Sequence, residues 1–325
     1  MSAERDILVS DDVRVIIEIV NYVVICGGVS IFGTVANSIN IIIFFRQGLK
    51  TTMNISFFGL AISDLCGLFL LFWFTIFLNP WVENSQLPLI TREFQYLVVG
   101  WPYECFSRIS NLITAFVAAE RCLSITYPLK VKRIITRRRA TAVVCCIYGI
   151  MFLSLLPEYA TSYIDWKFYA PKNDSRLGLV FTKNRKSMEG LVFILNAFLG
   201  ALSYLLVVMF TAVLMWKLKH NSAWRNKTAL YSGEQSLALK RDRKAMSMVL
   251  MIASVLVVLS SPSVMCLSVT FIVSDFSILG FYTNIFFTCW SFAFTASSVK
   301  SSIDIFLYYK MSSKYRKTFL ELFSK

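Results

Sequence analysis

An arginine stands at the end of a long apolar run, in the tripeptide Glu120-Arg121-Cys122. A charged side chain near the end of a membrane-length helix is costly unless it has a partner or a task. The guanidinium group is planar and permanently charged, and it can bind two acceptor atoms at once. The chemistry that this tripeptide predicts is therefore ion pairing. A basic loop that carries Pro128 and Leu129 follows at once.

Charged residues also interrupt two other apolar stretches. Glu104 precedes Arg108 by four residues, and Lys300 precedes Asp304 by four. Side chains at this spacing are neighbours on one face of a helix, so each pair can neutralise itself. The alternative for each pair is that one of its charges contacts another helix or a ligand.

No group of residues in the sequence points to catalysis or to metal binding. The eight cysteines contain no Cys-x-x-Cys spacing, and they lie in apolar stretches or at their ends. The single histidine, His220, ends one such stretch. We therefore expect a protein that is not an enzyme, with no metal, no cofactor and no disulfide in its outer loops.

Seven apolar stretches position these charges, and each is long enough to cross a bilayer, which takes roughly 20 helical residues. Lipid cannot satisfy backbone polar groups, so stretches of this length are expected to be helices. The sequence thus predicts an all-α membrane protein with a seven-transmembrane helix bundle. The stretches are Ile19–Phe45, Asn54–Val82, Phe94–Ile125, Ala140–Pro157, Gly190–Trp216, Ala245–Ser274 and Phe276–Tyr309.

Most lysines and arginines lie on one side of this arrangement, in segments 46–53, 121–139, 217–244 and 310–325. Basic residues favour the cytoplasmic side of a membrane. We therefore expect residues 1–18 to be extracellular, residues 19–309 to span the plasma membrane and residues 310–325 to be cytoplasmic. The net charge of +14 then reflects orientation and attraction to anionic lipid, not binding to nucleic acid.

The cytoplasmic end has the pattern of a short amphipathic helix. Four apolar residues recur at every fourth position, so they share one face. We expect this C-terminal helix to lie in the inner membrane interface, and a disordered basic tail is the alternative. The four residues are Met311, Tyr315, Phe319 and Phe323.

The longest outer segment, residues 158–189, is polar and of mixed charge, and we expect it to be a loop. Asn173-Asp174-Ser175 within it matches the acceptor pattern for N-linked glycosylation. We therefore expect Asn173 to be glycosylated.

Several short motifs follow one another along the seven stretches. They are Gly33-Thr34-Val35-Ala36-Asn37, Leu60-Ala61-Ile62-Ser63-Asp64-Leu65, Glu120-Arg121-Cys122, Pro128-Leu129, Ser261-Pro262 and Asp304-Ile305-Phe306-Leu307-Tyr308. In this order the set resembles the rhodopsin-like G-protein-coupled receptors across the whole chain. One such motif is a weak signal, whereas the ordered set is a strong one.

A narrower set of motifs is similar to invertebrate receptors of the FMRFamide-receptor-like and chemosensory group. Its members are Phe106-Ser107-Arg108-Ile109-Ser110, Glu120-Arg121-Cys122-Leu123, Pro128-Leu129-Lys130-Val131-Lys132, Ser222-Ala223-Trp224-Arg225 and Tyr308-Tyr309-Lys310-Met311-Ser312-Ser313-Lys314-Tyr315-Arg316. This resemblance implies no particular ligand.

The sequence also departs from the family pattern. Tyr96 stands where the family has a cysteine bonded to the second outer loop, and that loop has no cysteine here. Tyr148 replaces the usual tryptophan of the fourth span, and Ser260 replaces the tryptophan two residues before Pro262. Ile305 replaces the usual proline of the seventh span, so a proline-induced distortion is not expected there.

The resemblance implies a switch at the inner end of the bundle. Arg121 would pair at rest with Glu120 and with Asp242, and breaking the second contact would free the sixth span. Leu129 and the basic loops would then meet a heterotrimeric G protein, and Tyr308 would belong to the same switch. One alternative is that Arg121 only extends its charged group to the inner membrane interface. The other is that Asp242 is a solvated residue among the charged residues that surround it in the sequence.

The resemblance also implies a polar network at mid-membrane, where the family often holds a sodium ion. Lys300 is an added cation, and we hypothesise that it replaces sodium as the counter-ion of Asp64 and Asp304. The alternative is a local pair of Lys300 with Asp304. The network residues are Asn37, Asp64, Ser110, Lys300, Ser301 and Asp304.

The outer half of the third span is where the family binds ligands. Arg108 would suit a carboxylate, and Glu104 would suit an amine or a peptide arginine. A neuropeptide is the preferred ligand, and a small chemosensory molecule is the alternative. The candidate ligand-binding residues are Tyr103, Glu104, Ser107, Arg108, Phe287 and Trp290.

Two other functions compete with this interpretation. An opsin would carry its retinal lysine ten positions before Tyr308, where Ser298 stands, and Lys300 lies about 200° further around the helix. A transporter or channel would need repeats, broken helices or a polar pore stripe, and the sequence has no clear sign of them.

Overall fold

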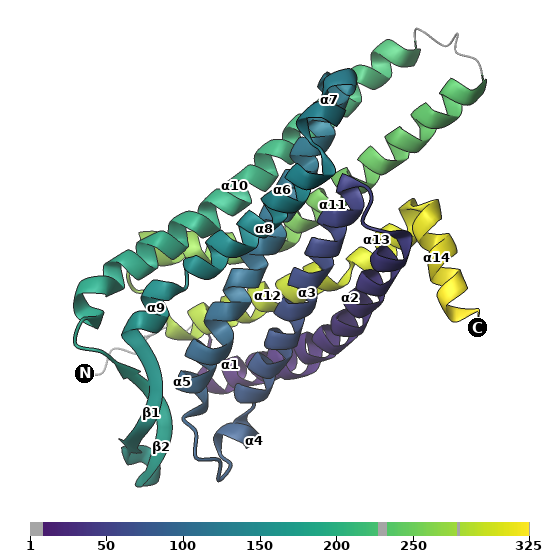
Figure 1. Ribbon diagram of the computed structural model, residues 1–325. Coiled ribbons are helices and arrows are strands. Elements are labelled where there is room, and N and C mark those ends of the chain that lie inside the picture. Colours follow the sequence, from purple (N-terminus) through teal and green to yellow (C-terminus); the bar gives the residue numbers. More distant parts are fainter. Residues whose placement is uncertain (1–8, 227–232, 278–279, 325) are drawn as a thin grey trace.

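Long helices lie side by side in this protein, and a β-hairpin leaves the bundle at one end (Figure 1). The structure is a computed structural model that describes residues 9–226, 233–277 and 280–324. Two short segments are π-helical, Ile19–Cys26 and Tyr96–Gly100. The bundle helices are α1 (Asp11–Glu18), α2 (Gly27–Gln47), α3 (Thr52–Phe77), α5 (Thr91–Gln95), α6 (Trp101–Thr126), α8 (Arg137–Leu153), α9 (Leu156–Thr161), α10 (Arg185–Asn226), α11 (Gly233–Ile272), α12 (Thr283–Ser302) and α13 (Asp304–Met311).

Five helical segments of the described part are long and apolar enough to cross a membrane: Asp11–Gln47, Thr52–Phe77, Arg137–Thr161, Arg185–His220 and Lys244–Ile272. Large apolar side chains such as Phe45, Ile194 and Phe271 are exposed on the outside of the bundle. Polar groups such as Asn37 and Asp64 are buried inside it. This distribution suits a helix bundle whose surroundings are lipid, because lipid is as apolar as the side chains that face it.

The two remaining long helices, α6 and α12, are more polar than these five. Helix α6 carries Glu104, Arg108 and the Glu120-Arg121 pair, and α12 carries Lys300 close to its end. Both helices pack inside the bundle, α6 against α3 and α10, and α12 against α2 and α11. Glu104, Arg108, the Glu120-Arg121 pair and Lys300 therefore lie on the two long helices that are least able to face lipid.

A glycine allows α2 to approach α12 closely. A Cβ atom at Gly33 would overlap the side-chain oxygen of Ser302 and would lie 2.6 Å from Cδ1 of Leu68. Small residues permit this kind of close backbone approach between helices in membranes.

The last bundle helix breaks at Ile303, between α12 and α13. The last bundle helix has no proline here, and polar side chains bind backbone oxygens just before the break. Asn37 of α2 donates its side-chain amide to the carbonyl oxygen of Ser301 (2.8 Å). Ser302 donates its hydroxyl to the carbonyl oxygens of Ser298 (2.7 Å) and Val29 (3.2 Å). Polar side chains thus satisfy backbone groups at the end of α12.

The outer segment expected to be a loop forms a two-stranded antiparallel hairpin, which corrects the all-α expectation. Its strands are β1 (Ser162–Tyr169) and β2 (Asp174–Phe181), and Tyr169 pairs with Asp174 at the turn. Asn173 has a φ of 50°, in the left-handed region that asparagine tolerates better than most residues. Aromatic and β-branched residues in β1 favour a strand, and Asn173 is exposed at the turn.

The chain ends in α14 (Ser313–Phe323), which lies at the end of the bundle away from the hairpin (Figure 1). Ser312 caps it by accepting the backbone N–H of Tyr315 (3.2 Å). The ring of Tyr315 is buried against Phe44 and Tyr308, with centroid distances of 5.7 and 5.5 Å. Phe319 packs on Tyr309 at 5.2 Å, whereas Phe323 is exposed.

Candidate ligand and switch site

Three helices contribute side chains to a buried polar network at the centre of the bundle. Ser110 of α6 donates its hydroxyl to Oδ1 of Asp64 on α3 (2.7 Å), and the oxygens of Ser63 and Ser110 lie 2.8 Å apart. Asp304 follows the break after α12 and accepts the Tyr308 hydroxyl at 3.4 Å. The structure therefore brings Asp64, Ser110 and Asp304 into one region.

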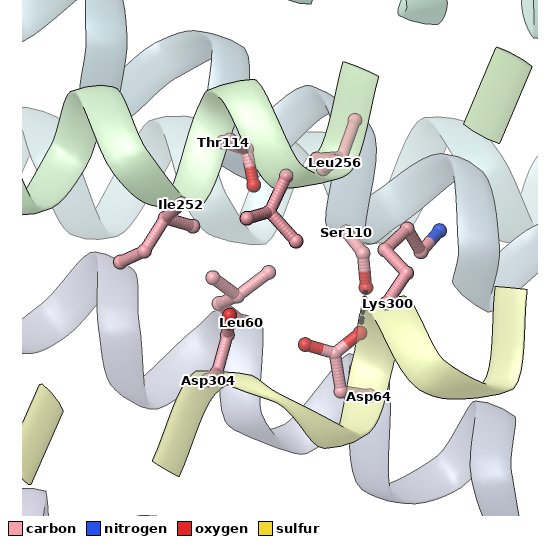
Figure 2. A pocket seen from close by; sticks show the side chains of 9 residues that line it. Leu60, Asp64, Ser110, Thr114, Ile252, Leu256, Lys300 and Asp304 are labelled. Carbon is pink, nitrogen blue, oxygen red and sulfur yellow. Dashed lines mark hydrogen bonds between the residues drawn. The ribbon is translucent and has the colours of Figure 1, made fainter. Parts of the chain in front are cut away.

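A small cavity separates the two carboxyl groups of this network, with room for little more than a water molecule. Figure 2 shows both carboxyl groups beside it, with the hydrogen bond from Ser110 to Asp64 drawn as a dashed line. Apolar side chains of α11 close one side. The lining residues are Leu60, Asp64, Ser110, Thr114, Ile252, Val255, Leu256, Lys300 and Asp304.

Lys300 lines this cavity, but its ammonium group points away from the carboxylates (Figure 2). Among the ion pairs of the described residues, none within 4 Å joins Lys300 to Asp64 or Asp304. Its hydrogen bond runs instead to the Ser107 hydroxyl of α6, at 3.4 Å. The structure therefore does not contain the close local pair between Lys300 and Asp304 that the four-residue spacing suggested.

Asn37 and Ser301 connect this network to the end of the bundle where α14 lies. Asn37 donates to the Ser301 carbonyl oxygen (2.8 Å), and Asn40 donates to Oδ1 of Asn37 (3.2 Å). Tyr315 of α14 then donates its hydroxyl to Oδ1 of Asn40. Burial raises the pKa of Tyr315, so the hydroxyl keeps the proton that it donates.

Ser63, which bonds to Ser110, and Asn40 and Tyr315, which extend the bonds of Asn37, do not stand out in the sequence as polar partners. Asn40 stands three residues after Asn37 in an apolar stretch, a spacing that puts both amides on one helix face. That spacing was the available signal for Asn40. The four-residue repeat places Tyr315 on an apolar face but does not reveal its partner Asn40, which lies 275 residues away in the sequence.

The inner end of α6 holds the expected pair of Glu120 and Arg121. Nη2 of Arg121 lies 2.8 Å from Oε1 of Glu120, and the same oxygen accepts the hydroxyl of Thr52 on α3. The Glu120 side chain is 5% exposed and the Arg121 side chain 16%. Leu129 belongs to helix α7 (Pro128–Ile134) and Asp242 to α11, but their side chains lie outside the described part of the structure.

The outer half of α6 brings Arg108 to α10. Arg108 is buried and donates through Nη1 to Oδ1 of Asn196 (2.6 Å). Its Nη2 lies 3.9 Å from Oε2 of Glu104, whose side chain is 44% exposed. The pair expected from the spacing thus exists, but the closest acceptor of Arg108 is a neutral amide that sequence analysis did not identify.

Two of the other ligand candidates, Tyr103 and Trp290, meet through one aromatic side chain. The ring of Phe294 on α12 lies 5.6 Å from that of Tyr103 and 5.9 Å from that of Trp290. Phe287 lies one turn before Trp290, and the guanidinium carbon of Arg14 sits 5.6 Å from its ring centroid. Helix α1 therefore packs over the outer end of α12, where Phe287 lies.

Hydrogen bonds and an ion pair tie the hairpin to the start of α5, close to where the family has its disulfide. The eight cysteines are free. Glu93, three residues before Tyr96, accepts the Lys167 ammonium group at 2.7 Å and the Leu179 N–H at 2.7 Å. Glu93 thus joins both strands to the bundle. At the turn, a hydrogen bond from Arg176 holds the pKa of Asp174 below its usual range.

We expect the variant Glu93→Gln to loosen the hairpin, because the amide cannot form the ion pair with Lys167. The pair is partly exposed, so a loss of about 1 kcal/mol or less is expected. Hydrogen–deuterium exchange at the Leu179 amide should become faster. The matched control is Glu83→Gln, which removes the exposed pair of Glu83 with Arg92. Unchanged exchange in both variants would contradict a role for Glu93.

A second ion pair beside the hairpin is buried. Nη1 of Arg185, at the start of α10, lies 2.7 Å from Oε2 of Glu158 on α9, and these side chains are 8% and 0% exposed. Arg185 also donates to the hydroxyls of Thr161 and Ser162. Sequence analysis did not single out this cluster, which joins the base of the hairpin to two helices.

Comparison with known proteins matches residues 23–325 to the family model described as "Serpentine type 7TM GPCR chemoreceptor Srw". One curated relative is the Galanin-like G-protein coupled receptor npr-9 of Caenorhabditis elegans, 27% identical over 125 residues, or 38% of this chain and 28% of that protein. Another is the motilin receptor of Homo sapiens, 27% identical over 140 residues, or 41% of this chain and 31% of that protein. The aligned segments thus span less than a third of either relative.

The family match and the bundle geometry agree. The match covers nearly the whole chain, from the first long helix through α14. Both curated relatives are receptors by name. The chain therefore belongs to the Srw family of serpentine seven-transmembrane G-protein-coupled chemoreceptors, whose members are receptors rather than enzymes.

Proposed function

We propose that this protein is a ligand-activated receptor that passes an extracellular signal to a heterotrimeric G protein. The observation that carries the proposal is the Glu120–Arg121 pair at the inner end of α6. Arg108, with its partners Asn196 and Glu104, lies near the outer end of the same helix. The Asp64–Ser110 network lies between them. One helix therefore links a place suited to ligand binding with a place suited to switching.

In this proposal the bundle crosses the plasma membrane seven times, with α6 and α12 completing the five apolar segments. Residues 1–18 are extracellular, residues 19–309 span the membrane, and residues 310–325 are cytoplasmic. Helix α14 lies along the inner interface, and Asn173 carries a glycan on the outer side. The concentration of basic residues near the inner ends supports this orientation.

Activation breaks the contact of Arg121 with Asp242 and so frees the sixth span. Arg121 then contacts the G protein together with Leu129 of α7, while Tyr308 moves with α13. Asp242 of α11 is the second resting partner of Arg121. The buried position of Glu120 supports the resting pair, because a carboxylate with so little exposure needs a cation or several donors.

Ligand binding at the outer half of α6 reaches the switch through the central network. The ligand contacts Tyr103, Glu104, Ser107 and Arg108 on α6, and Phe287 and Trp290 on α12. The small cavity between Asp64 and Asp304 lies against α11, so a movement of α11 would change the surroundings of both carboxylates. A network with two arrangements is the kind of element that a ligand can bias.

Two ligand classes have support. The description of the family model names chemoreceptors, which favours a small molecule. The two curated relatives are named for galanin-like and motilin receptors, which favours a peptide, although they align over less than a third of their length. A neuropeptide and a small chemosensory molecule therefore both belong in a ligand screen.

Second-messenger output in cells that co-express the receptor and a promiscuous G protein tests this function. A saturable response to one ligand class is expected, and Arg121→Ala should lower its maximum by about tenfold or more, because it removes charge-assisted hydrogen bonds. The exposed Lys317→Ala is the control and should respond normally. Equal responses in wild type and Arg121→Ala, at matched surface expression, would count against the proposed switch.

A further inference from the structure

Lys300 is a buried cation that lacks a close anionic partner. It is 5% exposed, and its hydrogen bond to Ser107 is long at 3.4 Å. The carboxylates near enough to act on it electrostatically are Asp64, Glu104 and Asp304, and none forms an ion pair with it within the described residues. A buried ammonium group is costly without an anion and well-placed acceptors.

The direction of this side chain is informative. Ser110 binds Asp64, and Ser107 lies one helical turn closer to the outer end of α6. Because Lys300 binds Ser107, its ammonium group lies on the outer side of the Asp64 carboxylate. Figure 2 shows the same divergence, with the nitrogen directed away from both carboxyl groups.

A second buried cation lies beside Ser107. Arg108 uses one donor for the neutral amide of Asn196, and its remaining anionic neighbour, Glu104, is 3.9 Å away and partly exposed. A guanidinium group has five donors, so Arg108 keeps unused capacity. Lys300 and Arg108 thus both keep donors for an anion in the part of the bundle where the proposed ligand site lies.

We propose that Lys300 and Ser107 bind a carboxylate group of the ligand, with Arg108 supplying the second positive charge. This inference rests on the proposed function and adds the chemical class of the ligand to it. The carboxylate belongs to a small organic acid or to the free C-terminus of a peptide. Peptides with an amidated C-terminus lack this charge. When an acid binds, the Lys300 ammonium group moves toward it and away from Asp64. Ligand binding thereby changes the charge around the central network.

The purified full-length receptor in lipid nanodiscs tests the site with acetate as the minimal probe. Acetate at saturating concentration should raise the unfolding temperature by about 2–4 °C, and acetamide should not. Lys300→Gln should lose the acetate effect and Lys300→Arg should keep it. The exposed Lys310→Gln is the matched control and should behave as wild type. Equal effects of acetate on wild type and Lys300→Gln, or no effect on wild type, would overturn the proposal.

Signalling assays separate the two sources of carboxylate. Monocarboxylic acids are paired with their primary amides, and peptides are made with free and with amidated C-termini. Whichever set activates the receptor, the acid form should be about 30-fold or more stronger than its amide, and Lys300→Gln should remove that difference. Amides as active as their acids would overturn the proposal. Basal nucleotide exchange on a purified G protein, compared between wild type and Arg121→Ala, tests the receptor function separately.

Discussion

Cells that express Glu158→Ala are expected to carry much less folded receptor than cells that express the wild type. The substitution leaves the Arg185 guanidinium, which is 8% exposed, without its carboxylate partner. Removing one member of a buried ion pair typically costs about 3–5 kcal/mol, because the remaining charge stays desolvated. The loss would act where α9, the hairpin and α10 meet. Thermal unfolding of the purified receptor and surface immunolabelling measure it.

The double variant Glu158→Leu/Arg185→Met is the control for this prediction. Apolar side chains of similar volume often replace a buried ion pair at little cost. The double variant should therefore regain most of the stability that Glu158→Ala loses. If both variants were equally unstable, the charge itself would not explain the effect, and the hydroxyl partners Thr161 and Ser162 would deserve separate substitutions.

Gly33→Ala is expected to disturb both folding and signalling. The new methyl group would overlap the Ser302 side chain and would lie 2.6 Å from Cδ1 of Leu68. Overpacking of this kind costs about 1–3 kcal/mol. Relief requires α2 and α12 to separate, which would also stretch the Asn37–Ser301 hydrogen bond. A lower unfolding temperature and a changed basal second-messenger level would be the measured results.

Gly28→Ala supplies the comparison on the same helix. No atom lies within 4 Å of a Cβ at Gly28, so alanine fits without displacement. Because alanine favours helix over glycine by up to about 1 kcal/mol, this variant should be as stable as wild type or more so. Equal destabilisation by both substitutions would show that the contact with Ser302 and Leu68 is not what makes alanine costly at Gly33.

The helices and the charged positions were predictable because hydrophobicity and short-range spacing determine them. The five apolar segments overlap the expected spans, and the Glu120–Arg121 pair forms as expected. Tyr148, which replaces the usual tryptophan, donates its hydroxyl to the Gly59 carbonyl oxygen (2.8 Å). Tyr148 lies on α8, and its hydroxyl calls for a polar partner, but the sequence does not show that this partner is on α3.

Long-range partners were not predictable from one sequence. Glu93 and Lys167 are 74 residues apart, and both strands of the hairpin are needed before Glu93 has its two donors. The polar, mixed-charge composition of residues 158–189 suggested a loop. A strand is stabilised by packing against a partner strand, which the composition of one segment does not reveal. Lys300 was unpredictable for another reason. Its four-residue spacing from Asp304 predicts that the two side chains are close, but the lysine side chain extends toward Ser107 instead.

The break at Ile303 has a consequence for how the receptor assembles. A proline would bend the seventh span in any surroundings, even when that helix is alone in the membrane. The reason is that the proline ring itself removes a backbone N–H and clashes with the preceding turn. Here the carbonyl of Ser301 is held by Asn37 of another helix, and Ser302 reaches Val29 of the same neighbour. A last helix that is alone in the membrane would therefore lack both contacts, and they would form only when the first and last spans meet.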